Sequence, residues 1–93
     1  MQYYLHCEVS EGPRPGYKSV GVESIEGYTE FLVIEERFLA TNGQDWYLPI
    51  AIVGKDADHG TKLVELPLEA DSGAKRVWVH DESITDKPQK VFA

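Results

Sequence analysis

The sequence predicts a mainly β protein, a small antiparallel barrel or sandwich of five to six strands with a long central hairpin. Apolar and polar residues alternate with a period of two near the N-terminus, two apolar runs flank Asn42-Gly43, and Gly or Pro turns separate the other short apolar segments. A chain of 93 residues fits one domain. We expect residues 1–80 to form it, with 81–93 as a polar C-terminal tail or short helix.

Two strands are predicted before the central hairpin. Residues 11–16 contain two prolines and two glycines, so we expect a loop there. A second strand follows over 17–25, with Val20 and Val22 inward, and Glu26-Gly27 is expected to turn the chain. In the first strand, apolar and polar residues alternate, so four side chains are expected to point inward: Tyr3, Leu5, Cys7 and Val9.

The central hairpin is predicted from the apolar runs 30–40 and 46–54, because an Asn-Gly pair favours a two-residue type I′ turn. This register sets Leu39 opposite Trp46 and Glu36 opposite Pro49. The Glu36–Pro49 pair is then a non-hydrogen-bonded pair, in which the missing N–H of Pro49 is not needed. The other side of this strand should be unpaired or bulged near Pro49.

A helix over 30–41 is the alternative, and it would give an α+β fold. Thr29 is a suitable N-cap, and Gly43 lies just past the expected end of the helix. We favour a strand, because the run Phe31-Leu32-Val33-Ile34 favours β structure and agrees with the Asn-Gly turn.

The rest of the chain continues the pattern of short strands. Residues 55–60 are a polar turn, and a strand over 61–66 ends at Pro67. Residues 68–73 form a loop, and 74–80 form the last clear strand.

Both faces of the predicted hairpin are apolar. Leaving four large apolar side chains in water would forgo about 6–12 kcal/mol, roughly the whole stability of a small domain. Either the chain's own loops with Val91 and Phe92 cover the second face, or a partner does. One face carries Val33, Leu39, Trp46, Leu48, Ile50 and Ile52, and the other carries Leu32, Ile34, Phe38, Tyr47, Ala51 and Val53. The expected interface residues are Ile34, Phe38, Tyr47 and Val53.

A second candidate binding face lies on the last strand. If Val77 and Val79 point inward, then Arg76, Trp78 and His80 point outward together. The alternative is that Trp78 is core and the two valines lie outside. Trp and Arg are enriched at binding hot spots.

Composition restricts partners and compartment. Nine Lys and Arg against sixteen Asp and Glu give a net charge of −7, which disfavours nucleic acid and anionic membranes. Cys7 is the single cysteine, so an intramolecular disulfide is impossible. The N-terminus lacks a signal-peptide pattern and no apolar stretch is long enough to span a bilayer, so we expect a cytoplasmic protein.

No motif predicts a catalytic residue, a metal site or a cofactor. Asp56–Gly60 resembles part of a calcium loop, but Thr61 replaces the required glycine and Pro67 replaces the bidentate glutamate. Neighbours on a strand point to opposite faces, so His6 and Cys7 do not share an ion. A buried, unpaired Glu35 would be a site candidate, because its pKa would rise.

We therefore expect a non-catalytic binding or self-assembly module that uses the apolar hairpin face, as a homodimer or with another protein. One alternative is a small-molecule-binding domain with an aromatic-lined pocket that includes Trp46 and Trp78. The other is an acidic inhibitor of a nucleic-acid-binding protein. An enzyme is less favoured, because no motif places two chemically complementary groups together.

Overall fold

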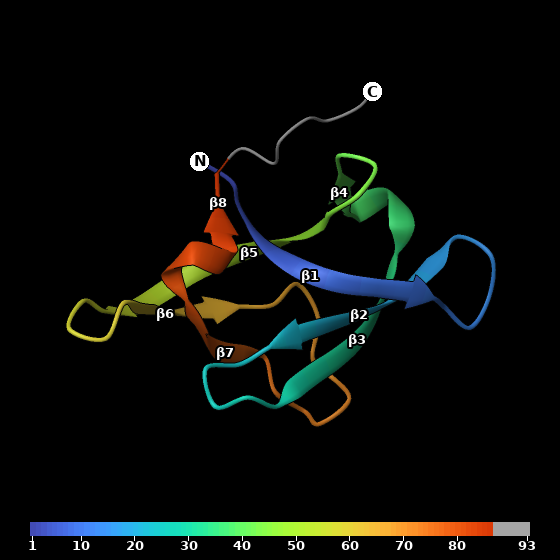
Figure 1. Ribbon diagram of the computed structural model, residues 1–93. Coiled ribbons are helices and arrows are strands. Elements are labelled where there is room, and N and C mark those ends of the chain that lie inside the picture. Colours follow the sequence, from blue (N-terminus) through green and yellow to red (C-terminus); the bar gives the residue numbers. More distant parts are fainter. Residues whose placement is uncertain (87–93) are drawn as a thin grey trace.

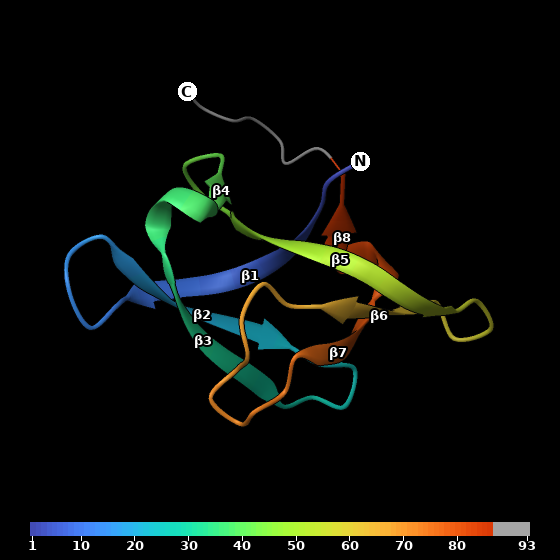
Figure 2. The ribbon, with the colours of Figure 1, turned by 180° about the vertical axis from the view of Figure 1, so that it is seen from behind.

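The computed structural model describes residues 1–86, which form one curled sheet of antiparallel strands (Figures 1 and 2). The mainly β fold class is confirmed, and residues 29–35 are a strand, so the helix alternative is wrong. Two short 3-10 helices interrupt the chain, η1 (Glu36–Phe38) and η2 (Asp81–Ser83). The strands are β1 (Tyr3–Glu11), β2 (Tyr17–Glu23), β3 (Thr29–Glu35), β4 (Ala40–Thr41), β5 (Trp46–Asp56), β6 (Thr61–Glu65), β7 (Arg76–His80) and β8 (Ile84–Thr85).

The sheet is built around the long strand β1. Its order is β3-β2-β1-β5-β6-β7, with β4 added to β5 and β8 added to β1. The first half of β1 pairs with β5 and its second half pairs with β2, so β1 joins the two sides of the fold. Figures 1 and 2 show the sheet curling into a half-barrel.

The outer strands β3 and β7 are linked through loops at one end of the half-barrel. The Ile25 N–H in the β2–β3 turn donates to the Trp78 carbonyl at 3.0 Å. The Asp71 N–H in the β6–β7 loop donates to the Phe31 carbonyl at 2.7 Å. The sheet is therefore closed by a few loop contacts at this end and not by a strand ladder.

The concave side of the sheet holds the apolar core. The predicted inward directions on β1 and β2 are confirmed, because period-two alternation is a local property of a strand. On β7, where the sequence left the direction open, Val77 and Val79 point inward. The buried apolar residues are Leu5, Cys7, Val20, Val22, Leu32, Ile34, Leu48, Ile50, Val64, Leu66, Ala70, Val77 and Val79.

The predicted register of the central hairpin is wrong. β3 pairs along its whole length with β2, and only Ala40 and Thr41 pair with β5. Thr41 lies opposite Trp46, where Leu39 was expected. The connecting loop is 42–45, in which the Asn42 side chain accepts the N–H groups of the two last residues. β3 ends where η1 begins. The Leu39 N–H closes η1 by donating to the Glu36 carbonyl at 3.0 Å.

The two predicted hairpin faces are therefore rearranged. Leu32 and Ile34 of β3 point into the same core as Leu48 and Ile50 of β5. The expected gap beside Pro49 is present, although Pro49 lies opposite Tyr4 of β1 and not opposite Glu36. On its other side, β5 pairs with β4 up to Tyr47 and with β6 from Ala51, so no strand covers 48–50 there.

β7 is followed by η2 and then by the short strand β8. Ile84 and Thr85 form β8 and pair with Leu5 and Tyr4 of β1. Val91 and Phe92, which belong to one of the two covers considered for the second face, lie outside the described residues. No helix within residues 1–86 has the length and apolar character needed to span a membrane.

Candidate functional site

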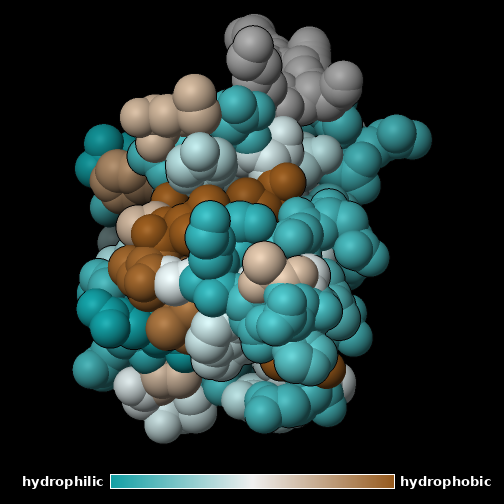
Figure 3. All heavy atoms as spheres, turned by 90° about the vertical axis from the view of Figure 1, so that its left-hand side faces the viewer, coloured by the Kyte–Doolittle hydropathy of each residue, from teal (hydrophilic) through white to brown (hydrophobic). Residues whose placement is uncertain are grey.

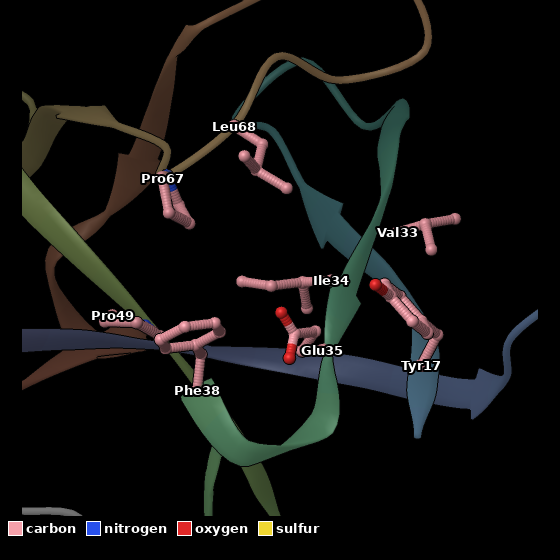
Figure 4. Close-up of a pocket in the computed structure, with 8 residues that line it drawn as sticks. All are labelled: Tyr17, Val33, Ile34, Glu35, Phe38, Pro49, Pro67 and Leu68. Carbon is pink, nitrogen blue, oxygen red and sulfur yellow. The ribbon is translucent and has the colours of Figure 1, made fainter. Parts of the chain in front are cut away.

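An apolar groove of about 320 Å³ opens between β3 and the uncovered part of β5. Four chain segments meet there: the start of β2, the end of β3 with η1, the middle of β5, and the loop after β6. We call it the β3 groove. Its lining residues are Tyr17, Val33, Ile34, Glu35, Phe38, Pro49, Pro67 and Leu68 (Figure 4).

Unpaired strand edges border the groove. The Phe31 carbonyl points away from β2, toward Asp71. Because this direction repeats every second residue, the Val33 N–H and C=O also point away from β2. Within residues 1–86, no further strand pairs with this edge and no backbone hydrogen bond from a loop reaches Val33.

The opposite border comes from β5. The Ile50 carbonyl accepts a 3.0 Å hydrogen bond from the Gln2 side chain, on the β1 side. By the same alternation, the Pro49 carbonyl points toward the groove. Pro49 has no N–H, so its place in the gap between β4 and β6 removes no ladder hydrogen bond.

The walls of the groove are partly exposed, and its floor is core. Ile34 is 5% exposed, whereas Phe38 and Leu68 are 47% and 45% exposed. Figure 4 shows Ile34 and Phe38 directed into the space between β3 and Pro49, with Leu68 reaching in from the loop. Covering a large apolar side chain stabilises by about 1.5–3 kcal/mol. The groove can therefore gain substantial free energy from an apolar occupant.

The rim of the groove is acidic. Glu35 accepts a 2.8 Å hydrogen bond from Arg37, and this bond together with the Glu35 charge raises the pKa of Arg37. The Arg37 guanidinium also lies 4.4 Å from the centre of the Phe38 ring. Glu35 is thus paired, and it is not the isolated buried carboxylate that would be a site candidate. The flanking segments 33–38 and 67–71 hold one cation, Arg37, and four carboxylates, Glu35, Glu36, Glu69 and Asp71. Lys18 of β2 also lies 3.9 Å from Glu36, so the rim keeps an excess of two carboxylates.

A second hollow, of about 490 Å³, lies beside β7, and we call it the Trp78 hollow. The Nδ1 atom of His59 lies 2.8 Å from a carboxylate oxygen of Asp56, within hydrogen-bond distance. The β5–β6 turn and β7 supply most of the hollow and lie at the left of Figure 1. Figure 3 views this side and shows a band of apolar side chains among polar ones. The lining residues are Ile25, Asp56, His59, Thr61, Trp78 and His80.

The structure separates the four interface residues expected on the hairpin. Ile34 and Phe38 line the β3 groove together, although Ile34 is core. Tyr47 is half-buried, with its ring edge-on to that of His6 at 5.7 Å. Val53 is exposed at a bulge of β5, outside the groove, where the pairing with β6 shifts by one residue.

Val77 and Val79 of β7 point inward, which is the arrangement that the second candidate face requires. Trp78 and His80 point outward and border the Trp78 hollow. Arg76 is held by Glu65 at 3.1 Å, and its hydrogen bond, together with the Lys75 charge, lowers the pKa of Glu65.

Sequence reasoning missed several lining residues of both hollows. Tyr17, Pro67 and Leu68 reach the β3 groove from segments that were expected to be an ordinary strand start and a loop. The apolar pair Pro67-Leu68 ahead of a polar loop was the available signal. Asp56 and His59 join Trp78 only through the pairing of β5, β6 and β7.

The described residues show no metal cluster, and Cys7 is a poor nucleophile. In residues 1–86, no group of three or more His, Cys, Asp or Glu side chains is placed to hold a metal ion. Burial and the nearby Glu8 charge raise the pKa of Cys7 to about 12, which suppresses the thiolate.

Comparisons with known protein families, with curated proteins and with solved structures give no match to this chain.

Proposed function

We propose that this protein is a non-catalytic binding module that takes up part of another protein chain in the β3 groove. The main support is an apolar groove bordered by unpaired strand edges, because both apolar surface and free backbone groups are satisfied by a partner chain. The partner is a second copy, giving a homodimer, or a different protein. The single, buried cysteine agrees with work in a reducing compartment such as the cytoplasm.

The acidic rim favours a basic partner. A nucleic-acid-binding protein belongs to that class, so inhibition of such a protein is one form that this binding function takes. Direct binding of nucleic acid is disfavoured by the net charge of −7.

Sedimentation velocity over a range of micromolar concentrations, together with affinity capture of partners, tests this proposal. Leu68→Lys places a charge in the groove at a side chain that is 45% exposed, so the fold should tolerate it. Ile25→Lys is the matched control, because Ile25 is 37% exposed and borders the other hollow. We expect Leu68→Lys to weaken self-association or capture at least tenfold, and Ile25→Lys to have little effect.

A wild-type chain that stays monomeric would exclude the homodimer. If captured proteins are also the same for wild type and Leu68→Lys, the groove is not the binding site.

A small-molecule site in the Trp78 hollow is the second candidate. An aromatic side chain and polar groups converge there, as in many ligand pockets. Thermal-shift screening separates this function from the first: a ligand whose stabilisation is lost in Trp78→Ala but kept in Leu68→Lys would support the hollow.

A further inference from the structure

We infer that the β3 groove binds an extended, basic peptide segment, which adds a short strand to the edge of β3 and places an apolar side chain in the groove. This inference deepens the proposed function and rests on it. Three features of the groove carry it: the free backbone edge, the apolar floor and the acidic rim.

The free edge determines how the backbone of the segment binds. The Phe31 carbonyl is already occupied by Asp71, and the edge is open from Val33 to Glu35. Two residues of a strand extend about 7 Å, so the ladder is short. Main-chain hydrogen bonds therefore set the register and direction of the segment, and its side chains must supply much of the affinity.

The floor determines which side chain is bound. Side chains of an added strand alternate, so every second one faces the groove. They would meet Ile34, Phe38 and Leu68, with Pro49 and Pro67 as further apolar walls. Val, Leu or Phe suits this surface, because most of the lining side chains are apolar.

The rim determines the charge of the segment. Four carboxylates and one guanidinium lie in the two flanking segments. Glu35 pairs with Arg37 and Glu36 lies 3.9 Å from Lys18, which leaves Glu69 and Asp71. Lys or Arg next to the apolar anchor would offset the remaining carboxylates. Two copies meeting rim to rim would instead bring like charges together, so the occupant is a basic segment of a different chain.

Fluorescence anisotropy with labelled peptides tests the inference on the full chain. The probe is Lys-Val-Lys-Phe-Lys-Val-Lys, whose alternation puts apolar side chains on one face of a strand. The control peptide carries Glu in place of every Lys. A third peptide has the Lys sequence with alternate backbone nitrogens methylated, so that it cannot donate along one edge.

We expect the Lys peptide to bind, with an affinity that falls as salt is added. The Glu peptide and the methylated peptide should each bind at least tenfold more weakly. Equal affinity of the Lys and Glu peptides would overturn the basic preference, and equal affinity of the methylated peptide would overturn strand addition.

A pair of variants at Val33 separates backbone from side-chain effects. Val33→Pro removes the N–H that points away from β2, at an edge position that tolerates proline. Val33→Thr keeps the N–H and a β-branched side chain. We expect Val33→Pro to lower the affinity for the Lys peptide at least tenfold. The affinity of Val33→Thr should stay within about threefold of wild type, and circular dichroism should show both variants folded.

Failure of this inference is distinguishable from failure of the proposed function. If the Lys peptide does not bind, but Leu68→Lys still reduces self-association or partner capture, the groove binds chains of another kind and the inference is wrong. If Leu68→Lys changes neither the binding of the Lys peptide nor self-association and partner capture, both proposals are wrong.

Discussion

The Ser72 hydroxyl donates a 2.6 Å hydrogen bond to the carboxylate of Glu30, which is 42 residues away in the chain. Glu30 is only 8% exposed and lies on the inward side of β3. A buried carboxylate is costly without a donor, so Ser72 offsets part of that cost. Together with the bond from Asp71 to Phe31, it fixes the β6–β7 loop to β3 and so helps position Leu68 at the groove.

Ser72→Ala should lower the free energy of unfolding by about 1–3 kcal/mol, because it leaves the Glu30 carboxylate without this donor. Urea denaturation followed by tryptophan fluorescence measures the change. Ser10→Ala, at an exposed position of β1, is the matched control and should change the stability little. Equal effects of the two substitutions would show that the bond to Glu30 contributes nothing.

Leu32 and Val33 test the orientation of β3. Leu32 is 1% exposed and Val33 is 38% exposed, so the two neighbours point to opposite sides. Leu32→Ala should cost about 2–5 kcal/mol through lost burial and a cavity. Val33→Ala should cost under about 1 kcal/mol, since little of its side chain leaves the core. Similar costs in urea denaturation would contradict the orientation of this strand.

The parts of the fold that depend on local patterns were predictable from the sequence. The alternation through Leu5 and Cys7 placed β1 correctly, and Val77 and Val79 did the same for β7. Strand pairing is not local. The side chains of β3 fit β2 or β5 equally well by pattern, and nothing in Glu36-Arg37-Phe38 indicates that the strand ends in a 3-10 turn there. The Asn-Gly dipeptide correctly predicted a turn. The loop is longer than the expected two residues, because the Asn42 side chain accepts backbone N–H groups across 42–45.

The groove was less predictable than the fold, because its residues come from four segments. Ile34 and Phe38 were expected at an interface, yet they were assigned to a hairpin face that does not form. Pro49 gave a correct signal of an unpaired edge, since a proline needs no ladder partner. Pro67 and Leu68 lie across the groove from Pro49 because of how far the whole sheet curls. No short sequence pattern encodes this curvature.

Gly12 is required by a close approach within the β1–β2 hairpin. Its N–H donates to the Tyr17 carbonyl at 3.1 Å, and a Cβ at this position would lie 2.4 Å from the same oxygen. Gly12→Ala should therefore destabilise by about 1–3 kcal/mol, because the backbone must shift. At Gly54 an added Cβ would meet the Leu63 side chain at 3.3 Å, so Gly54→Ala should cost less. Thermal denaturation compares the two, and a larger loss at Gly54 would contradict this account.

The buried thiol of Cys7 should be unreactive in the folded protein. Its pKa is raised to about 12, and only the thiolate attacks alkylating agents. At pH 8, iodoacetamide should modify the native chain far more slowly than the urea-unfolded chain, as followed by mass spectrometry. Equal rates would show that Cys7 is accessible without unfolding.

The same thiol should make stability depend on alkaline pH. Burial raises the pKa of Cys7 from 9.0 to about 12, so between these values the folded state keeps a proton that the unfolded state releases. This contribution is fully present below about pH 9 and is lost as pH rises toward 12, by up to about 1.4 kcal/mol per pH unit. Other groups titrate in this range, so the measurement is the difference between wild type and Cys7→Ala in urea denaturation from pH 8 to pH 10.5. Wild type should lose stability more steeply than Cys7→Ala, and parallel curves would mean that Cys7 is as easily ionised in the folded chain as in the unfolded one.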